Sequence, residues 1–105
     1  MFMEWKQLNI WVYTEAIDPG IVHRESFLTT YMPEQLHVGD YLKYTDPSRE
    51  LSGLTVVAVD EKGLTLRVGK DREVCLLPGD NKELATGARD YSYFYLHAAL
   101  EPMEE

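Results

Sequence analysis

The sequence predicts an all-β domain of about six or seven short antiparallel strands, curled into a small barrel or a β-meander. Short segments rich in Val, Tyr, Trp, Thr and Leu alternate apolar with polar residues, and clusters of Gly, Pro and Asp separate them. No segment shows the length and periodicity of a long amphipathic helix, so we expect at most one short helical turn. The 105 residues suit a single domain, residues 1–105, with one core.

The first two strands are predicted over residues 5–16 and 22–31. A turn at Asp18, Pro19 and Gly20 joins them, because proline presets the second turn position and glycine accepts the positive backbone angle at the third. Type II turns splay hairpins, so a register shifted by one residue stays open. The favoured register pairs opposite charges, Glu15 with Arg24, and pairs core residues, Val12 with Phe27 and Leu8 with Tyr31.

The middle strands begin at about Asp40, and a loop over residues 46–53 precedes the clearest hairpin. In "LTVVAVDEKGLTLRV" a type I turn closed by a glycine bulge at Gly63 is predicted, with Val59 opposite Leu64 and then Val57 opposite Leu66. A further strand follows over residues 72–77, and its register places Val74 opposite Leu66 and Glu73 opposite Arg67. Residues 78–88 are predicted to be a loop with one helical turn around residues 81–85.

The segment from "VGDYLKY" through "LTVVAVDEKGLTLRV" to the next short strand resembles SH3-like small barrels, such as Tudor and KOW modules. The resemblance covers residues 38–77 and consists of a rhythm of strands and turns. It implies an antiparallel SH3-like barrel, which removes exposed sheet edges. Because it includes no family motif, it transfers no functional residue.

Charge and cysteine usage exclude several classes of partner and site. The chain has 18 acidic and 10 basic residues, a net charge of −8, spread along its length. Such a surface disfavours binding to nucleic acid and to anionic membranes. Cys75 is the single cysteine, so one chain can form neither a disulfide nor a thiolate metal cluster. With no signal peptide or apolar span in "MFMEWKQLNIWVY", we expect a cytoplasmic protein.

No catalytic set is visible in the sequence. A nucleophile with an adjacent base and orienting group is missing, and so is a glycine-rich phosphate loop, so we expect a protein that is not an enzyme and holds no cofactor. The alternative is a metal-dependent protein or small enzyme with a site near His23, Glu25 and His37. His23 and Glu25 lie two residues apart on one strand face, and imidazole and carboxylate groups are metal ligands.

The last predicted strand, residues 89–100, places aromatic rings on alternate positions. The residues between the rings are expected in the core: Phe94, Leu96, Ala98 and Leu100. The other face then presents a candidate binding row: Tyr91, Tyr93, Tyr95 and His97. Seven tyrosines and two tryptophans exceed what a small core needs, since a buried tyrosine hydroxyl needs a partner. Candidate neighbours of the row are Trp5, Trp11, Tyr41 and Tyr44.

The leading interpretation of this row is a protein-binding module or accessory subunit. An acidic, aromatic surface suits a cationic or proline-rich peptide. Two other interpretations stay open: the row packs beneath residues 78–88 or an adjacent strand, or it contacts a second copy. The strand would extend about 40 Å at the usual rise, longer than a small barrel requires. We therefore expect it to bend, bulge, end early in a helical turn, or reach a second subunit in a homodimer.

Overall fold

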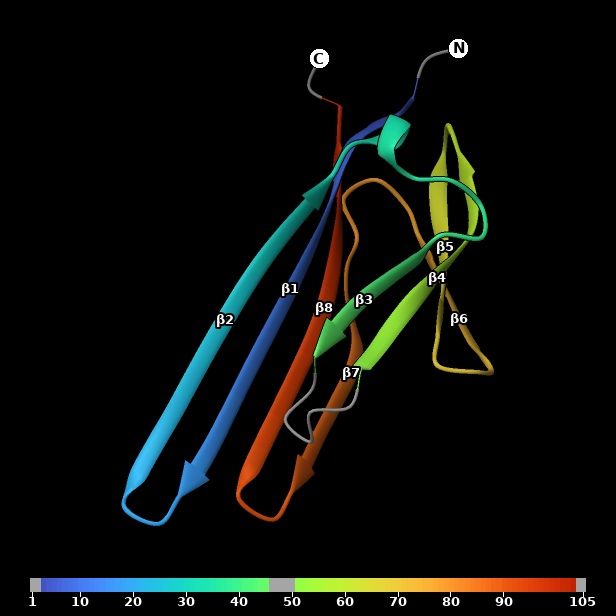
Figure 1. Cartoon of the computed structure of the whole chain (residues 1–105). Coiled ribbons are helices and arrows are strands. Elements are labelled where there is room, and N and C mark those ends of the chain that lie inside the picture. The colour runs from blue at the N-terminus through green and yellow to red at the C-terminus, as the bar shows by residue number, and fades with distance from the viewer. Residues whose placement is uncertain (1–2, 46–50, 104–105) are drawn as a thin grey trace.

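The protein folds into two antiparallel four-stranded sheets, shown in Figure 1. The computed structural model describes residues 3–45 and 51–103. Its strands are β1 (Trp5–Asp18), β2 (Ile21–Tyr31), β3 (Tyr41–Thr45), β4 (Leu51–Asp60), β5 (Gly63–Val68), β6 (Arg72–Leu76), β7 (Asn81–Arg89) and β8 (Ser92–Pro102). A 3-10 helix, η1 (Pro33–Gln35), connects β2 to β3. The described residues contain no helix long and apolar enough to cross a lipid bilayer.

The all-β class is confirmed, but the described chain has eight strands rather than six or seven, and its sheets are not closed. One sheet, here called the long sheet, has the order β2-β1-β8-β7; the other, the short sheet, has the order β3-β4-β5-β6. The SH3-like barrel is therefore not confirmed. The first and last strands of the chain pair with each other, and the two sheets bury their apolar faces against one another instead of one sheet closing on itself.

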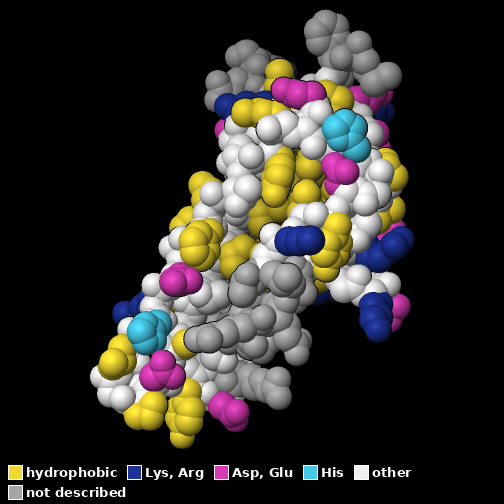
Figure 2. All heavy atoms as spheres, in the orientation of Figure 1, with side chains coloured by type: hydrophobic (Ala, Val, Ile, Leu, Met, Phe, Trp, Pro, Cys, Tyr) yellow, Lys and Arg dark blue, Asp and Glu magenta, His cyan; other side chains and the backbone are white. Residues whose placement is uncertain are grey.

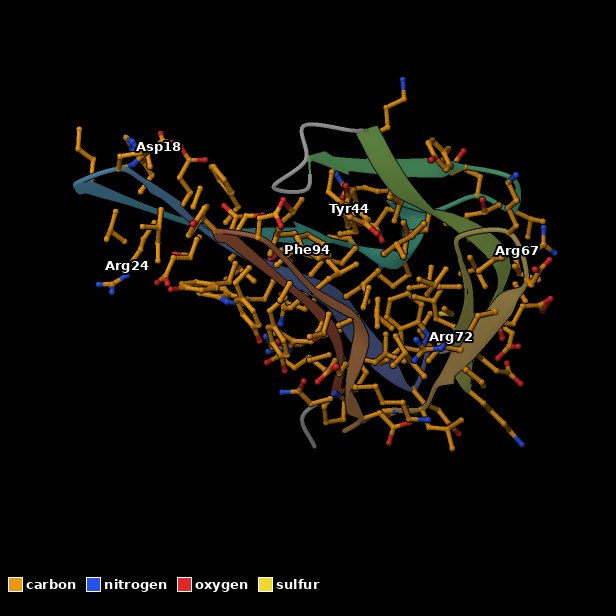
Figure 3. The ribbon with its side chains drawn as sticks, turned by 90° about the horizontal axis from the view of Figure 1, so that it is seen from below. Asp18, Arg24, Tyr44, Arg67, Arg72 and Phe94 are labelled. Carbon is orange, nitrogen blue, oxygen red and sulfur yellow. The ribbon has the colours of Figure 1, made fainter. Side chains whose placement is uncertain are left out.

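The core lies between the sheets and uses alternate residues of both. The central strands of both sheets, such as β1, β8 and β5, bury one face, as the period of two requires. The fully buried side chains include Leu8, Leu96 and Leu100 from the long sheet and Leu54, Leu64 and Leu66 from the short sheet. At one end of the core, Tyr44 of β3 stacks on Phe94 of β8 with ring centroids 5.5 Å apart, and Figure 3 shows this pair between the sheets.

The first hairpin has the favoured register. Asp18 pairs with Ile21 and Glu15 with Arg24, so the one-residue slip does not occur. Gly20 has a φ of 85°, the positive angle that the turn required. The residues of the turn were therefore enough to set the register of the β1–β2 hairpin.

The second hairpin begins as predicted and then departs from its register. Val59 pairs with Leu64, but a bulge at Val57 leaves Val56, not Val57, opposite Leu66. Gly63 does not have a positive φ, so the predicted glycine bulge is wrong. Glycine is needed there because a Cβ atom would lie 2.6 Å from the Leu76 carbonyl oxygen on β6.

The next strand pairing, β5 with β6, has the predicted register. Val74 lies opposite Leu66, and Glu73 lies opposite Arg67. The Arg67 Nη2 and Glu73 Oε2 atoms are 3.5 Å apart in an ion pair. Pairing apolar residues with each other and opposite charges with each other was enough to predict this register. The reason is that a tight three-residue turn joins two short strands.

The segment predicted to be a loop with a helical turn, residues 78–88, contains strand β7. It pairs with β8 and has a bulge between Glu83 and Ala85. The bulge turns Leu84 into the core, where it is fully buried, although the two residues before it, Lys82 and Glu83, are charged. Because the bulge interrupts the alternation, the sequence did not show a strand.

The β1–β2 hairpin projects beyond the short sheet, and the molecule is elongated, 54 × 30 × 18 Å (Figures 1 and 3). Figure 3 shows Asp18 and Arg24 on this projection, far from Arg67 of the short sheet. All residues of β2 except Tyr31 are exposed. The short sheet thus covers only part of one face of the long sheet.

Candidate functional site: an aromatic face of the long sheet

The face of the long sheet opposite to the core, here called the outer face, gathers aromatic rings from its two central strands. Ile10 and Val12 of β1 are buried in the core, so the alternating residues of that strand point outward. The same alternation applies to β8. Five rings result, here called the ring cluster: Trp11, Tyr13, Tyr93, Tyr95 and His97.

Antiparallel pairing of β1 with β8 brings these rings into contact. Trp11 pairs with His97, and Tyr13 pairs with Tyr95. The ring centroids of Trp11 and His97 are 6.5 Å apart, those of Tyr95 and His97 are 5.2 Å apart, and those of Tyr13 and Tyr93 are 6.2 Å apart. Each ring therefore supports another, which keeps a partly exposed surface rigid.

The predicted row is thus assigned to the face expected for it, with one departure. Tyr93, Tyr95 and His97 lie on the outer face, while Phe94 and Leu96 are buried as predicted. Tyr91 lies in the β7–β8 turn, is 74% exposed, and is not one of the contacting rings. The strand begins after Tyr91 because Asp90 has a φ of 51° in this turn.

Two interpretations of the row can be compared with the structure. Residues 78–88 do not cover the row, because β7 lies beside β8 in the same sheet. The rings do contact those of the adjacent strand β1. Strand β8 is an 11-residue strand that runs to Pro102 and is paired along both edges within the chain, so the expected early end in a helical turn is wrong.

Of the candidate neighbours, only Trp11 lies beside the row. Trp5 is fully buried, and its indole N–H donates to the Asp60 carbonyl at 2.9 Å. Tyr44 stacks in the core, and Tyr41 belongs to the short sheet. Tyr13 was missed as a neighbour, although it follows Trp11 by two residues in the first predicted strand and therefore shares a face with it. The missing information was the long-range pairing of β1 with β8.

A polar chain borders the ring cluster on the β1–β2 side. The Tyr13 hydroxyl donates to Glu15 Oε2 at 2.9 Å, and Arg24 Nε donates to the same oxygen at 2.6 Å. These bonds, with that of Arg24 the stronger cause, hold the pKa of the Glu15 carboxyl below its ordinary value. The bond to Glu15 raises the pKa of Tyr13. At neutral pH, Glu15 is therefore a carboxylate, Tyr13 a neutral phenol and Arg24 a guanidinium.

Changing Arg24 to glutamine is expected to raise the pKa of Glu15 toward its ordinary value, because the bond from Arg24 is the main cause of the lowering. A carboxyl group with a lowered folded-state pKa stabilises the fold above its unfolded-state pKa, and that contribution is lost as the pH falls through the folded-state value. NMR titration of the Glu15 carboxyl carbon measures the change. Lys6→Gln is the matched control, since Lys6 pairs with Glu101 at 3.1 Å. An unchanged Glu15 pKa in Arg24→Gln would contradict the assigned cause.

The alternative metal-site residues lie apart. His23 follows the first hairpin turn, with its Nε2 atom 3.5 Å from Asp18 Oδ2, and Glu25 is two residues further along β2. His37 lies beyond the other end of β2, with its Nδ1 atom 3.5 Å from Asp40 Oδ2. The histidine side chains visible in Figure 2 lie near opposite ends of the molecule. Within residues 3–45 and 51–103, no three His, Cys, Asp or Glu side chains are grouped as a metal site would require.

Comparison with known proteins gives no relative for this chain. No protein-family model matches it, and neither a curated protein nor a solved structure matches it. The ring cluster and the charges around it are the observations from which a function can be inferred.

Proposed function

We propose that this protein is a non-enzymatic binding module or accessory subunit that holds a basic segment of a partner protein against the ring cluster. One observation carries the proposal: five contacting rings lie on the sheet face opposite to the core. A sheet face that packs against nothing within its own chain usually carries polar side chains. Rings concentrated there suit contact with another molecule.

Aromatic side chains are well suited to such a contact. Tyrosine and tryptophan supply large apolar areas with few rotatable bonds, and they dominate the residues whose loss most weakens protein interfaces. Tyr93 is 38% exposed, while Trp11, Tyr13 and Tyr95 are half-buried against their neighbours. Little side-chain entropy would be lost on binding, because the rings already restrain one another.

The charges around the cluster favour a basic partner. The net charge of the chain is −8. On the outer face the basic side chains Lys6 and Arg24 are each ion-paired, with Glu101 at 3.1 Å and with Glu15 at 2.6 Å. Exposed Glu83 lies opposite His97 in the β7–β8 register. A Lys or Arg side chain of the partner would find ring faces and nearby carboxylates, and both attract a cation.

The test is a comparison of partner capture by three forms of the protein. Tyr93→Ala with Tyr95→Ala should abolish capture from the native cell, because a ring that anchors an interface contributes about 2 kcal/mol or more. Tyr91→Ala is the matched control: Tyr91 is the most exposed of the large apolar side chains described but lies outside the cluster. Binding should then be reproduced with the purified partner and should weaken as salt is added.

Three results would count against the proposal. The double variant could unfold, which circular dichroism would reveal and which would mean that the rings are needed for folding. Capture could survive the double variant, so that another surface is used. Tyr91→Ala could weaken capture as much as the double variant, which would remove the distinction between the cluster and the turn.

A further inference from the structure

We propose that the free edge of β2 pairs with β2 of a second copy of this chain, in antiparallel orientation, so that two long sheets join into one. This inference concerns a different surface from the ring cluster and does not depend on the proposed function. It begins from the edge strands, because an unpaired strand edge presents backbone donors and acceptors to any other strand.

The four edge strands of the two sheets are β2, β7, β3 and β6, and three of them have features that discourage pairing. Strands β3 and β6 are only five residues long. Strand β7 is bulged. Two side chains also link the β6 and β7 edges: Arg72 Nη1 donates to the Leu84 carbonyl at 2.7 Å, and Lys82 Nζ donates to the Cys75 carbonyl at 2.9 Å.

Strand β2 has none of these features. It is 11 residues long, contains neither lysine nor proline, and pairs with β1 in unbroken register from Ile21 to Tyr31. Short length, bulges, proline and charged side chains, above all lysine, are means by which natural sheets avoid edge pairing. The charged side chains of β2 are Arg24 and Glu25, and a long regular edge without lysine, proline or a bulge is suited to receive another strand.

The direction of the backbone groups on this edge follows from one hydrogen bond. The Ile17 N–H donates to the Tyr91 carbonyl on the β8 side, so the neighbouring residue, Asp18, directs its groups toward β2. Because bonded and non-bonded pairs alternate, odd-numbered residues of β2 bond to β1. The residues whose N–H and C=O groups point to the free edge are Val22, Arg24, Ser26, Leu28 and Thr30.

One register satisfies all of these groups at once. A two-fold axis at Ser26, perpendicular to the sheet, pairs each outward residue with an outward residue of the second copy and overlaps the strands along their whole length. Arg24 then lies opposite Leu28, and Glu25 lies opposite Phe27, so no like charges meet. Sliding one β2 strand by two residues along the other leaves backbone groups at the strand ends unpaired. In one of the two directions it also places Glu25 opposite Glu25 of the second copy.

The side chains of β2 make a second copy the favoured occupant. Val22 and Leu28 are 50% and 58% exposed on one face of the strand, and Ile21 and Phe27 are 57% and 56% exposed on the other. Strand β2 has one basic and one acidic side chain, Arg24 and Glu25, so the strand itself adds no formal net charge to this contact. The two-fold axis would also place the outer faces of both copies on the same side of the joined sheet, so that the two ring clusters form one surface.

Ser26→Pro tests the dimer. Proline at this position removes an N–H that points to the free edge and leaves the bonds between β1 and β2 in place. Light scattering should give twice the 12.1 kDa chain mass for the parent protein at high micromolar concentration and a monomer for Ser26→Pro. Ser26→Ala, which keeps the N–H, should remain dimeric. A monomeric parent protein, or an undiminished dimer in a folded Ser26→Pro, would overturn the proposal.

Cross-linking tests the register without relying on the proline variant. In a Cys75→Ser background, Ser26→Cys should form a disulfide-linked dimer, because Cα atoms of a bonded pair lie about 5.5 Å apart, within disulfide range. Thr30→Cys is the control. It would lie roughly 26 Å from its copy at the usual rise per residue and should not cross-link. Equal cross-linking of both variants, or of neither, would overturn the register.

Discussion

Replacing Leu96 by alanine is expected to lower the free energy of unfolding by about 2–5 kcal/mol. Leu96 is fully buried in β8, where it pairs with Val12 on one side and Ala85 on the other, and its side chain points between the two sheets. The loss combines the removed apolar area with the cavity left behind. Small domains have a total stability of about 5–15 kcal/mol, so urea unfolding should show a large shift of the midpoint.

The adjacent residue is the matched control. Tyr95→Ala removes a larger side chain from the same strand, but from the half-exposed outer face, and should cost only about 1 kcal/mol. This contrast tests the assignment of the two faces of β8 directly. A loss in Tyr95→Ala equal to that in Leu96→Ala would mean that the ring cluster belongs to a core.

Replacing Gly63 by alanine is expected to lower the free energy of unfolding by about 1–3 kcal/mol, although alanine is a small residue. Its Cβ atom would lie 2.6 Å from the carbonyl oxygen of Leu76, a backbone atom that cannot turn aside. Strands β5 and β6 would have to separate, which would disturb the buried Leu64 and Leu66. Thermal or urea unfolding measures the loss.

Gly87→Ala is the corresponding control. Gly87 lies in β7, its φ is not in the positive region, and an added Cβ would meet no atom within 4 Å. Alanine there should be neutral or slightly stabilising, by up to about 1 kcal/mol, because it reduces the freedom of the unfolded chain. Equal losses at Gly63 and Gly87 would show that the close approach of β6 is not the reason for glycine.

The parts of the fold that the sequence predicted correctly are local. Gly20 specified a turn, and the turn set the register of β1 with β2 from Asp18–Ile21 to Leu8–Tyr31. Alternation within β8 assigned Phe94 and Leu96 to the core and Tyr93 and Tyr95 to the opposite face. Both properties depend on residues close together in the chain, where turn chemistry and the period of two operate.

The errors arose where a strand departs from regular alternation. The bulge at Val57 shifted one register, and the bulge beside Leu84 made strand β7 look like a loop. A bulge inserts a single unpaired residue and has only a weak signature in one sequence. The predicted number of strands was therefore wrong and the predicted closed barrel is not confirmed, although the all-β class was correct.

The sequence by itself determined the strand character, the turns of the first hairpin and the two faces of the last strand. The tertiary structure decided that β1 lies beside β8, which brought Trp11 and Tyr13 to the tyrosine row, and that β2 lies at an open edge. The physical reason is that alternation specifies which face a side chain occupies. The backbone hydrogen bonds that join two strands are the same for every residue, so they do not distinguish one neighbouring strand from another. The choice of neighbour therefore depends on how the whole core packs.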